Sequence, residues 1–564
     1  MRSLPSFASK RVALSLLAFA VVSVLAGCKA KQRYADEAAS LPEPANEEVL
    51  YDEVTVTGSR IKRTDTETAS PSLQINREGI GQVLIAPGTS QPPLSPETVA
   101  GETYAATPDN PPLRAAETPL STFSIDVDTG SYANVRNLIQ NGMRPPADAV
   151  RAEEFINYFD YDYPLPTAAD PPFSVTIELG VAPWNARHQL LLVGLKGYEL
   201  PVAQIPKSNL VFLVDVSGSM DEPNKLPLLV DAFKLLVDQL DADDSVAIVV
   251  YAGAAGMVLP PTSGADKARI RRALDSLSAG GSTNGGQGIR LAYRLAHDAF
   301  IAGGINRVIL ATDGDFNVGT SSVDELKTVV EREREGGVSL TTLGFGRGNY
   351  NDQMAEQLAD VGNGNHYYID SLNEARKVLI EQRGSTLFTI ARDVKIQIEF
   401  NPAVVSEYRL IGYANRRLAD QDFADDRKDA GEIGAGHEVT ALYELALTGA
   451  GGEQLPALRY APEPSAAPPM RADELAFLKL RYKRPGSDAS TLWETPIANR
   501  SSGSGERLQF AAAVAGFAEV LRGSRWVGGF GYRDIAALAG GAIGRDPYGY
   551  RREFLQLVQR AVQL

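Results

Sequence analysis

The stretch of sequence that decides the fold reads Asn209-Leu-Val-Phe-Leu-Val-Asp215-Val-Ser217-Gly-Ser219. Its first half is a continuous apolar run of strand length, which is typical of a strand buried on both faces. Its second half places a carboxylate and two hydroxyls directly after that run. The stretch therefore predicts a buried strand whose carboxyl end carries polar side chains.

Apolar strands alternate with helical periodicity over the next 170 or so residues. Further buried strands are predicted at 245–251, 307–312, 338–345 and 366–369. The predicted helices lie at 225–240, 266–277, 287–302, 323–334, 353–361 and 371–382. This alternation predicts an α/β domain at 206–384 with a doubly wound, Rossmann-like parallel sheet. The ligand site of such a sheet lies outside the carboxyl ends of its strands.

Two more polar segments are expected at that edge of the sheet. Thr283 lies in the helix-to-helix loop Gly280-Gly-Ser-Thr-Asn-Gly285, and Asp313 follows the strand that ends at Thr312. The candidate donors are oxygen atoms only, from five side chains: Asp215, Ser217, Ser219, Thr283 and Asp313. Such donors suit Mg²⁺, Mn²⁺ or Ca²⁺ rather than zinc or copper.

These five residues resemble the metal-ion-dependent adhesion site (MIDAS) of von Willebrand factor type A (VWA) domains, whose motif is Asp-x-Ser-x-Ser with a distant Thr and Asp. The resemblance spans residues 208 to about 382. It implies that the five side chains form a metal shell, with Mg²⁺ as the expected cation. It also implies that an open coordination position accepts an acidic side chain of a protein partner. Taken singly, each piece has another explanation, as a helix cap or an ordinary turn.

Two segments of the sequence partly match calcium-binding loops. Residues 313–324 place Asp at spaced positions, but Val318 stands where a calcium-binding EF loop needs glycine, so that interpretation is rejected. Asp126-x-Asp128-x-Gly130 is also incomplete, and we expect a solvated turn there.

The regions on either side of the α/β domain alternate between apolar and polar residues, as half-buried strands do. Such strands are predicted at 173–179, 188–195, 394–400, 439–445 and 478–482, and helices at 129–141, 148–159, 506–522 and 550–563. Because two strands alone are not stable, we expect the strands to pair across the inserted domain in one β-sandwich. The flanks are then an α+β segment at 120–205 and a β-rich, helical domain at 385–564.

Three segments of these flanks resemble the signature segments of YfbK-type bacterial lipoproteins. They are Ser121-Thr-Phe-Ser-Ile-Asp-Val-Asp-Thr-Gly-Ser-Tyr132, the segment from Arg409 to Phe423, and Glu432-Ile-Gly-Ala-Gly-His-Glu-Val439. The resemblance covers the chain from about residue 116 and implies its architecture. It implies little about activity.

The chain has a single cysteine, at the end of an apolar run that follows a basic start. Residues 1–27 have the pattern of a secretory signal, and Leu25-Ala-Gly-Cys28 resembles the lipobox of bacterial lipoproteins. The resemblance implies a lipid anchor on Cys28, and Lys29 in place of Asp favours the outer over the inner membrane. A plain secretion signal with an incidental cysteine is the alternative. Cleavage removes Arg2, Lys10 and Arg11 and no acid, so the net charge of −15 becomes −18.

Residues 28–119 are predicted to be a disordered linker. They contain eleven of the 34 prolines and no sustained apolar periodicity. The segment 53–61, Glu-Val-Thr-Val-Thr-Gly-Ser-Arg-Ile, resembles a segment near the mature N-terminus of TonB-dependent receptors.

The net charge and the motifs that the sequence lacks exclude several classes of function. The acidic balance argues against nucleic acid as a partner, and neither a nucleophile elbow nor a general base stands beside the metal motif. The four histidines are scattered, and each is expected to be a surface or a satisfied core residue. The sequence therefore predicts a non-enzymatic, lipid-anchored cell-envelope protein that binds an acidic protein partner through a metal. A structural scaffold that contacts a TonB-type system is the main alternative, and a metal-dependent hydrolase is the third.

Overall fold

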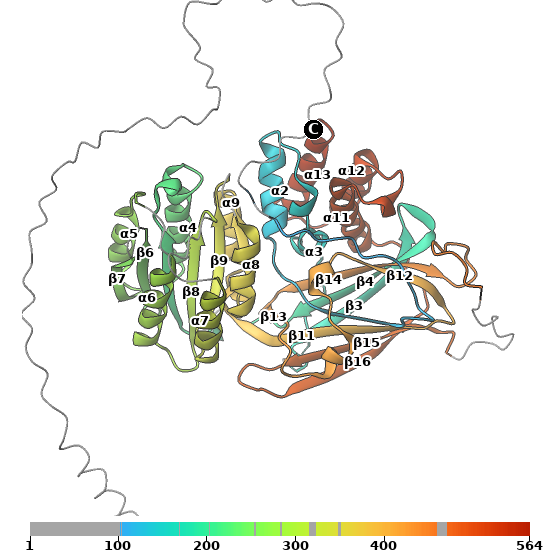
Figure 1. Cartoon of the computed structure of the whole chain (residues 1–564), viewed down its shortest axis with the longest axis horizontal. Coiled ribbons are helices and arrows are strands. Elements are labelled where there is room, and N and C mark those ends of the chain that lie inside the picture. Colours follow the sequence, from blue (N-terminus) through green and yellow to red (C-terminus); the bar gives the residue numbers. More distant parts are fainter. Residues whose placement is uncertain are drawn as a thin grey trace, which may run out of the picture. The chain divides into compact units, whose positions relative to one another are not determined.

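A computed structural model describes residues 102, 104–167, 170–201, 204–252, 255–281, 285–314, 323–347, 351–459 and 471–564. The expected signal segment, Cys28 and the segment 53–61 lie outside these residues. The described part contains an α/β unit and a flanking unit of two sheets and a helical layer (Figure 1). Within it, we find no helix with the length and apolar character needed to cross a membrane.

The α/β unit is built on a six-stranded sheet in the order β10-β9-β8-β5-β6-β7. Its strands are β5 (Ser208–Asp215), β6 (Ser245–Tyr251), β7 (Ala255–Ser263), β8 (Ile305–Thr312), β9 (Ser339–Phe345) and β10 (His366–Ile369). Neighbouring strands are parallel except β7, which runs antiparallel to β6 at the edge of the sheet. The strand order reverses beside β5, so the switch point of the sheet lies there.

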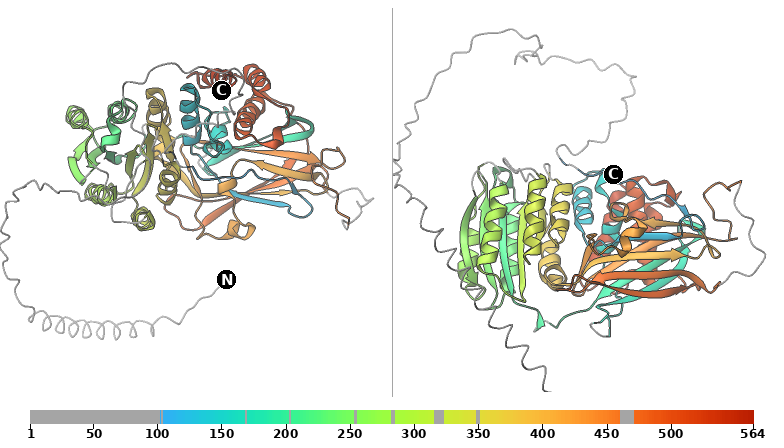
Figure 2. Two further views of the ribbon diagram at one scale, coloured as in Figure 1. Left: turned by 45° about the horizontal axis from the view of Figure 1, so that its top comes forward. Right: turned by 60° about the horizontal axis from the view of Figure 1, so that its bottom comes forward.

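Helices cover both faces of this sheet (Figures 1 and 2). On one face lie α4 (Leu226–Asp238), α5 (Lys267–Asp275) and α9 (Leu372–Arg376), and on the other α6 (Gly285–Asp298), α7 (Val323–Glu335) and α8 (Asp352–Val361). Phe212 of β5 stacks on Phe233 of α4 with ring centroids 4.1 Å apart, whereas the next residue, Leu213, packs into the opposite core. This arrangement confirms the predicted doubly wound fold.

The flanking unit is a sandwich of two antiparallel sheets. One has the order β1-β12-β14-β4-β3, and the other has the order β13-β11-β15-β16 with β2 also paired to β11. The strands are β1 (Leu113–Arg114), β2 (Leu120–Ser124), β3 (Phe173–Ala182), β4 (Asn185–Gly197), β11 (Thr389–Phe400), β12 (Val405–Ile411), β13 (Gly431–Gly434), β14 (Glu438–Leu447), β15 (Glu474–Lys483) and β16 (Ser490–Ala498). Leu192 of β4 pairs with Leu442 of β14, which lies on the other side of the α/β unit in the sequence. The expected pairing across the insertion is therefore confirmed.

A helical layer packs on the outer face of the first sheet. It consists of α2 (Gly130–Gln140), α3 (Ala152–Asn157), α11 (Glu506–Arg522), α12 (Tyr532–Gly541) and α13 (Tyr550–Ala561). Its core includes Phe159, Phe510 and Phe554, with ring centroids 5.1–5.6 Å apart, and it also takes in Leu190 and Leu192 from β4. Shorter helical segments occur at Ala147–Ala149, Gly218–Asp221, Lys377–Glu381, Arg383–Leu387, Ala414–Arg416, Asp420–Ala424 and Arg525–Val527.

The folded unit begins earlier than the predicted linker boundary at residue 119. β1 pairs with β12, and Asn110 donates hydrogen bonds from Nδ2 to the carbonyl oxygens of Leu410 (3.1 Å) and Gly412 (2.7 Å). Ala115 is fully buried. The prolines of this segment misled the prediction, because proline is also compatible with an extended chain along a sheet edge.

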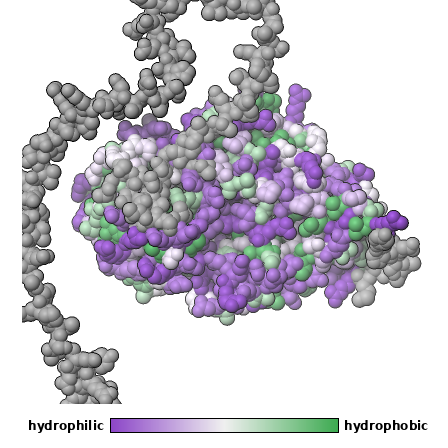
Figure 3. Space-filling view, in the orientation of Figure 1, coloured by the Kyte–Doolittle hydropathy of each residue, from purple (hydrophilic) through white to green (hydrophobic). Residues whose placement is uncertain are grey.

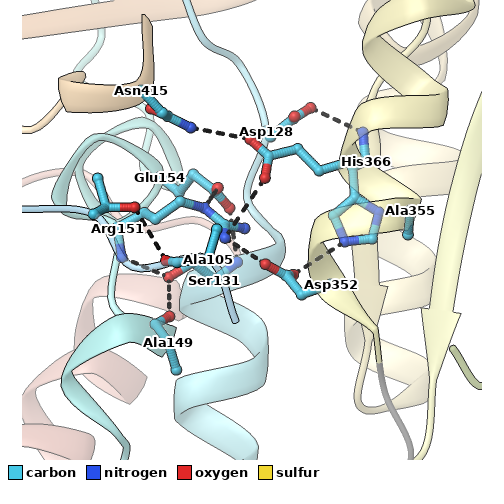
Figure 4. A network of polar contacts seen from close by, with 12 residues as sticks. Ala105, Asp128, Ser131, Ala149, Arg151, Glu154, Asp352, Ala355, His366 and Asn415 are labelled. Atoms are coloured by element: carbon cyan, nitrogen blue, oxygen red, sulfur yellow. Dashed lines mark hydrogen bonds and ion pairs between the residues drawn. The ribbon is translucent and has the colours of Figure 1, made fainter. Parts of the chain in front are cut away.

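Buried ion pairs join the two units, and Figure 4 shows one such network. Asp128 accepts a hydrogen bond from the His366 backbone N–H (2.8 Å) and pairs with Arg416, which also contacts Asp126, both at 3.3 Å. Arg151 pairs with Asp352 of α8. The expectation of a solvated turn at Asp126 and Asp128 is wrong, because both residues are at most 4% exposed. Burial raises the pKa of Asp128.

Candidate metal site

Asp215 stands at the end of the central strand, at the switch point of the sheet. It is fully buried, and its Oδ1 accepts a hydrogen bond from the backbone N–H of Ser217 at 2.8 Å. The parallel register places it beside Thr312, whose hydroxyl lies 3.4 Å from Oδ2. Burial and the nearby Asp313 raise the pKa of Asp215 to about 6, against the lowering effect of the Ser217 N–H. This carboxylate is thus costly to keep ionised without a cation.

Ser217 and Ser219 present their hydroxyls together in the loop after β5. Their Oγ atoms are 3.0 Å apart, and Ser217 is buried whereas Ser219 is exposed. Gly218 between them donates its N–H to the carbonyl oxygen of Gly281 at 3.2 Å. That contact brings the loop that carries Thr283 next to the two serines, although Thr283 itself lies outside the described residues.

Asp313 follows the neighbouring strand β8 and is also fully buried. Its Oδ2 accepts a hydrogen bond from the ammonium group of Lys225 at 3.1 Å, and the same group donates to the carbonyl oxygen of Ser219 at 3.0 Å. Asp215, Ser217, Ser219 and Asp313 therefore gather at the carboxyl ends of β5 and β8. This is the edge at which the strand pattern places them.

Two contributors escaped the sequence prediction. Lys225 is 3% exposed in its side chain and reaches Asp313 from 88 residues away in the sequence. Thr312 is predicted only as the last residue of a strand, yet its hydroxyl contacts Asp215 and also accepts a hydrogen bond from the Gly314 N–H at 3.0 Å. The only local signal for Lys225 is its place at the start of a helix six residues after Ser219.

The donor chemistry of these residues fits a hard divalent cation. Two buried carboxylates and two adjacent hydroxyls offer only oxygen atoms. Among the residues that the structure describes, no group of three or more His, Cys, Asp or Glu side chains is arranged to hold a metal. A site here consequently depends on the hydroxyls as well as on the carboxylates.

Three of the four histidine side chains make polar contacts away from the candidate site. His188 contacts Glu444 and the Gly452 carbonyl oxygen (both 2.6 Å), His297 contacts Glu333 (2.6 Å), and the ring of His366 contacts Thr342 (2.8 Å). His437 differs from the expectation of a satisfied core residue, because its buried Nδ1 has no hydrogen-bond partner. Burial and the cations Lys196 and Lys377 lower the pKa of His437 to about 3.

Comparison with known proteins agrees with this architecture. Residues 209–382 match the model of the von Willebrand factor type A domain, residues 385–564 that of the C-terminal region of the uncharacterized protein YfbK, and residues 98–192 one described as von Willebrand factor. The chain is 47% identical over 464 residues to the uncharacterized protein YfbK of Escherichia coli (strain K12), which covers 81% of this chain and 80% of that protein. The chain belongs to the YfbK family.

Two further proteins are similar to parts of this YfbK-family chain. A UPF0353 protein of Mycolicibacterium vanbaalenii is 27% identical over 223 residues, which is 34% of this chain and 66% of the relative. The solved structure of a von Willebrand factor type A protein from Catenulispora acidiphila is 18% identical, covers 70% of this chain and 91% of its own, and has a TM-score of 0.37. The VWA domain suggests a role in protein–protein interaction.

Proposed function

We propose that this chain is a lipid-anchored cell-envelope protein that binds a protein partner through a divalent-cation site and does not catalyse a reaction. The observation that carries the proposal is the convergence of Asp215, Ser217, Ser219 and Asp313 at the switch point of the sheet. Thr283 completes the donor set by its place in the sequence motif. Ser219 is exposed, so a partner can reach the cluster from solvent.

The residues of the site suit the capture of an acidic side chain. Asp215 and Asp313 would hold the cation, with Mg²⁺ as the first choice and Mn²⁺ or Ca²⁺ as alternatives, and the serine and threonine hydroxyls add no charge. When bound, the cation supplies an electrophilic position for a carboxylate of the partner. The chain has a net charge of −15, or −18 after cleavage, and repels acidic proteins over most of its surface. The bound cation would attract a carboxylate at this one site.

The face visible in Figure 3 supports polar recognition. It is mostly hydrophilic, with small apolar spots scattered over it. The net negative charge supports a protein partner over nucleic acid. The proposal is therefore a polar, metal-dependent contact with an envelope protein that presents an acidic residue.

The envelope location rests on the sequence. Leu25-Ala-Gly-Cys28 supports lipidation of Cys28, and Lys29 supports the outer membrane as the destination. Lipid chains on one cysteine, each contributing about 0.8 kcal/mol per buried methylene, hold a protein at a membrane stably when two or more are present. Metabolic labelling with a fatty acid, compared between the wild type and Cys28→Ala, tests the anchor.

A second function, that of a structural scaffold, is favoured by one specific observation. Arg136 of the flanking unit pairs with Asp370 (2.6 Å) and Glu374 (2.7 Å) of the α/β unit, and all three side chains are at most 3% exposed. A VWA unit bound so firmly could serve as a structural part, while the segment 53–61 contacts a TonB-type system.

One experiment separates the two functions. Full-length lipidated protein is cross-linked in envelopes and captured. The wild type, with and without chelator and with Mg²⁺ restored, is compared with the double variant Ser217→Ala/Ser219→Ala. The matched control is Ser263→Ala, an exposed serine that pairs with the first residue of β6 at the opposite edge of the sheet. We expect one partner that is lost in the double variant and with chelator, regained with Mg²⁺, and kept in the control. If the partner is captured equally with and without the divalent cation but is lost when residues 53–61 are deleted, the result supports the scaffold function instead. Metal-dependent turnover of a hydrolase substrate contradicts both.

A further inference from the structure

Lys225 occupies a fixed position inside the candidate site. Its ammonium group donates to Oδ2 of Asp313 (3.1 Å) and to the carbonyl oxygen of Ser219 (3.0 Å), and Oε1 of Glu222 lies 3.7 Å away. The Lys225 side chain is 3% exposed, whereas that of Glu222 is 61% exposed. The ammonium is therefore a buried, unscreened charge among the proposed metal donors, and Glu222 is largely screened by solvent.

The aliphatic stem of Lys225 packs against a glycine that follows a third strand. Gly346 follows β9 and has φ +73°, and a Cβ built on it would lie 2.2 Å from Cε and 2.5 Å from Cγ of Lys225. The methylenes of the lysine thus pass through space that only glycine leaves open. Three loops, after β5, β8 and β9, meet around this one side chain.

The charge of the site follows from this placement. Asp215 and Asp313 contribute two negative charges and Lys225 one positive charge, so the site carries a net charge of −1 and would carry +1 with a divalent cation. Without the lysine the same centre would be neutral once loaded. Oxygen-ligand sites bind cations with an affinity that depends on the charge count of their ligands.

We propose that Lys225 is a positioning residue that sets the charge of the metal site: it weakens the binding of the cation and strengthens the capture of the partner's carboxylate. The inference rests on the proposed function, because it needs the cation to bind at Asp215 and Asp313. Its distinguishing consequence is that loss of Lys225 moves two affinities in opposite directions. A lysine with only a structural role would weaken both or neither.

The test measures both affinities on purified protein. Calorimetry gives the affinity for Mg²⁺ alone and then, at saturating Mg²⁺, for a short peptide with blocked ends and a single glutamate, against the same peptide with glutamine. For Lys225→Met we expect Mg²⁺ to bind about tenfold more tightly and the glutamate peptide about tenfold more weakly, since a buried charge at this range has a large effect. Gly346→Ala displaces the stem of Lys225 but keeps its charge. Like Lys225→Met, it should strengthen the binding of Mg²⁺ and weaken the binding of the glutamate peptide.

The controls separate the possible failures. Lys207→Met removes a lysine that is 47% exposed and precedes β5 at the opposite end of the strand, so it should change neither affinity. Circular dichroism checks that every variant is folded. If the wild type binds Mg²⁺ but Lys225→Met and Gly346→Ala leave both affinities unchanged or shift them together, the inference is overturned and the proposed function stands. If the wild type binds no Mg²⁺, the proposed function falls as well.

Discussion

Lys377 is a buried cation at the junction of the two units. The residue is 3% exposed, its Nζ donates a hydrogen bond to the carbonyl oxygen of Tyr158 at 2.7 Å, and the same atom lies 3.2 Å from the centroid of the Tyr158 ring. Burial lowers the pKa of Lys377 to about 8, and Arg136 adds to that effect, whereas Glu374, Asp160 and Glu381 oppose it. The folded protein thus holds this proton less tightly than the unfolded chain does.

This difference predicts a pH dependence of stability. Below pH 8 both states carry the proton and the folded state bears the cost of burying it; as the pH rises toward 10.5, the folded state releases the proton first and the cost disappears. We expect the unfolding free energy of the wild type, relative to Lys377→Met, to rise by about 3 kcal/mol over this window, at ~1.4 kcal/mol per pKa unit. Urea titrations at several pH values measure it, with Lys428→Met, an exposed lysine, as the control. A constant or falling difference contradicts the prediction.

Site residues that stand at the end of a predicted strand could be placed from the sequence. Residues whose position depends on contacts with distant parts of the chain could not. Asp215 and Asp313 each follow an apolar run directly, so the edge of the sheet at which they stand follows from the local pattern. The contact between Lys225 and Asp313 spans 88 residues, and that between Asp128 and Arg416 spans 288. No local periodicity encodes such pairs, so the sequence pattern predicts neither the place of Lys225 in the site nor the burial of Asp128.

At the scale of elements, the sequence patterns located some strands at their observed bounds and missed others, both inside the sheets and at their edges. The prediction 245–251 coincides with β6, whereas β7 was missed because Pro260 and Pro261 interrupt its pattern. The predicted helix 371–382 is divided in the structure into α9 and a π-helical turn, and a further short helix follows at Arg383–Leu387. Apolar periodicity cannot separate α from π hydrogen bonding over a few residues, because the two differ by only one residue per bond.

A glycine before β10 lets two elements approach closely. A Cβ on Gly364 would lie 1.8 Å from the carbonyl oxygen of Leu340 in β9 and 2.6 Å from its carbonyl carbon. Backbone atoms on both sides cannot move aside as a flexible side chain can. We expect Gly364→Ala to lower the unfolding free energy by about 1–3 kcal/mol, the usual cost of overpacking. The matched control is Gly541→Ala at the end of α12. A Cβ there has no neighbouring atom within 4 Å, so this substitution should leave the unfolding free energy unchanged or raise it slightly. Equal effects of the two substitutions in urea denaturation contradict this account.

At the scale of the whole described part, the sandwich was predictable because amphipathic strands on both sides of the α/β unit each lacked a partner nearby. The contacts that fasten the α/β unit to the sandwich were not. They include two buried arginines, Arg136 and Arg151, paired with carboxylates of the α/β unit. Arginine in a sequence is expected at the surface unless paired, and the pairing is a product of the tertiary fold.

The buried pairs of these arginines lead us to expect that the two units unfold together. Removal of one partner of a buried pair leaves an uncompensated charge and costs about 3–5 kcal/mol, so Arg136→Met/Arg151→Met should weaken the junction more than the core of either unit. We expect scanning calorimetry to show one transition for residues 102–564 in the wild type and two in the double variant, with hydrogen exchange assigning the earlier one to the α/β unit. Arg427→Met/Arg484→Met removes two exposed pairs within the flanking unit, in which the arginines are 90% and 53% exposed, and should keep the single transition. Two transitions already in the wild type, or one at unchanged temperature in the double variant, would show that the buried ion pairs do not couple the units.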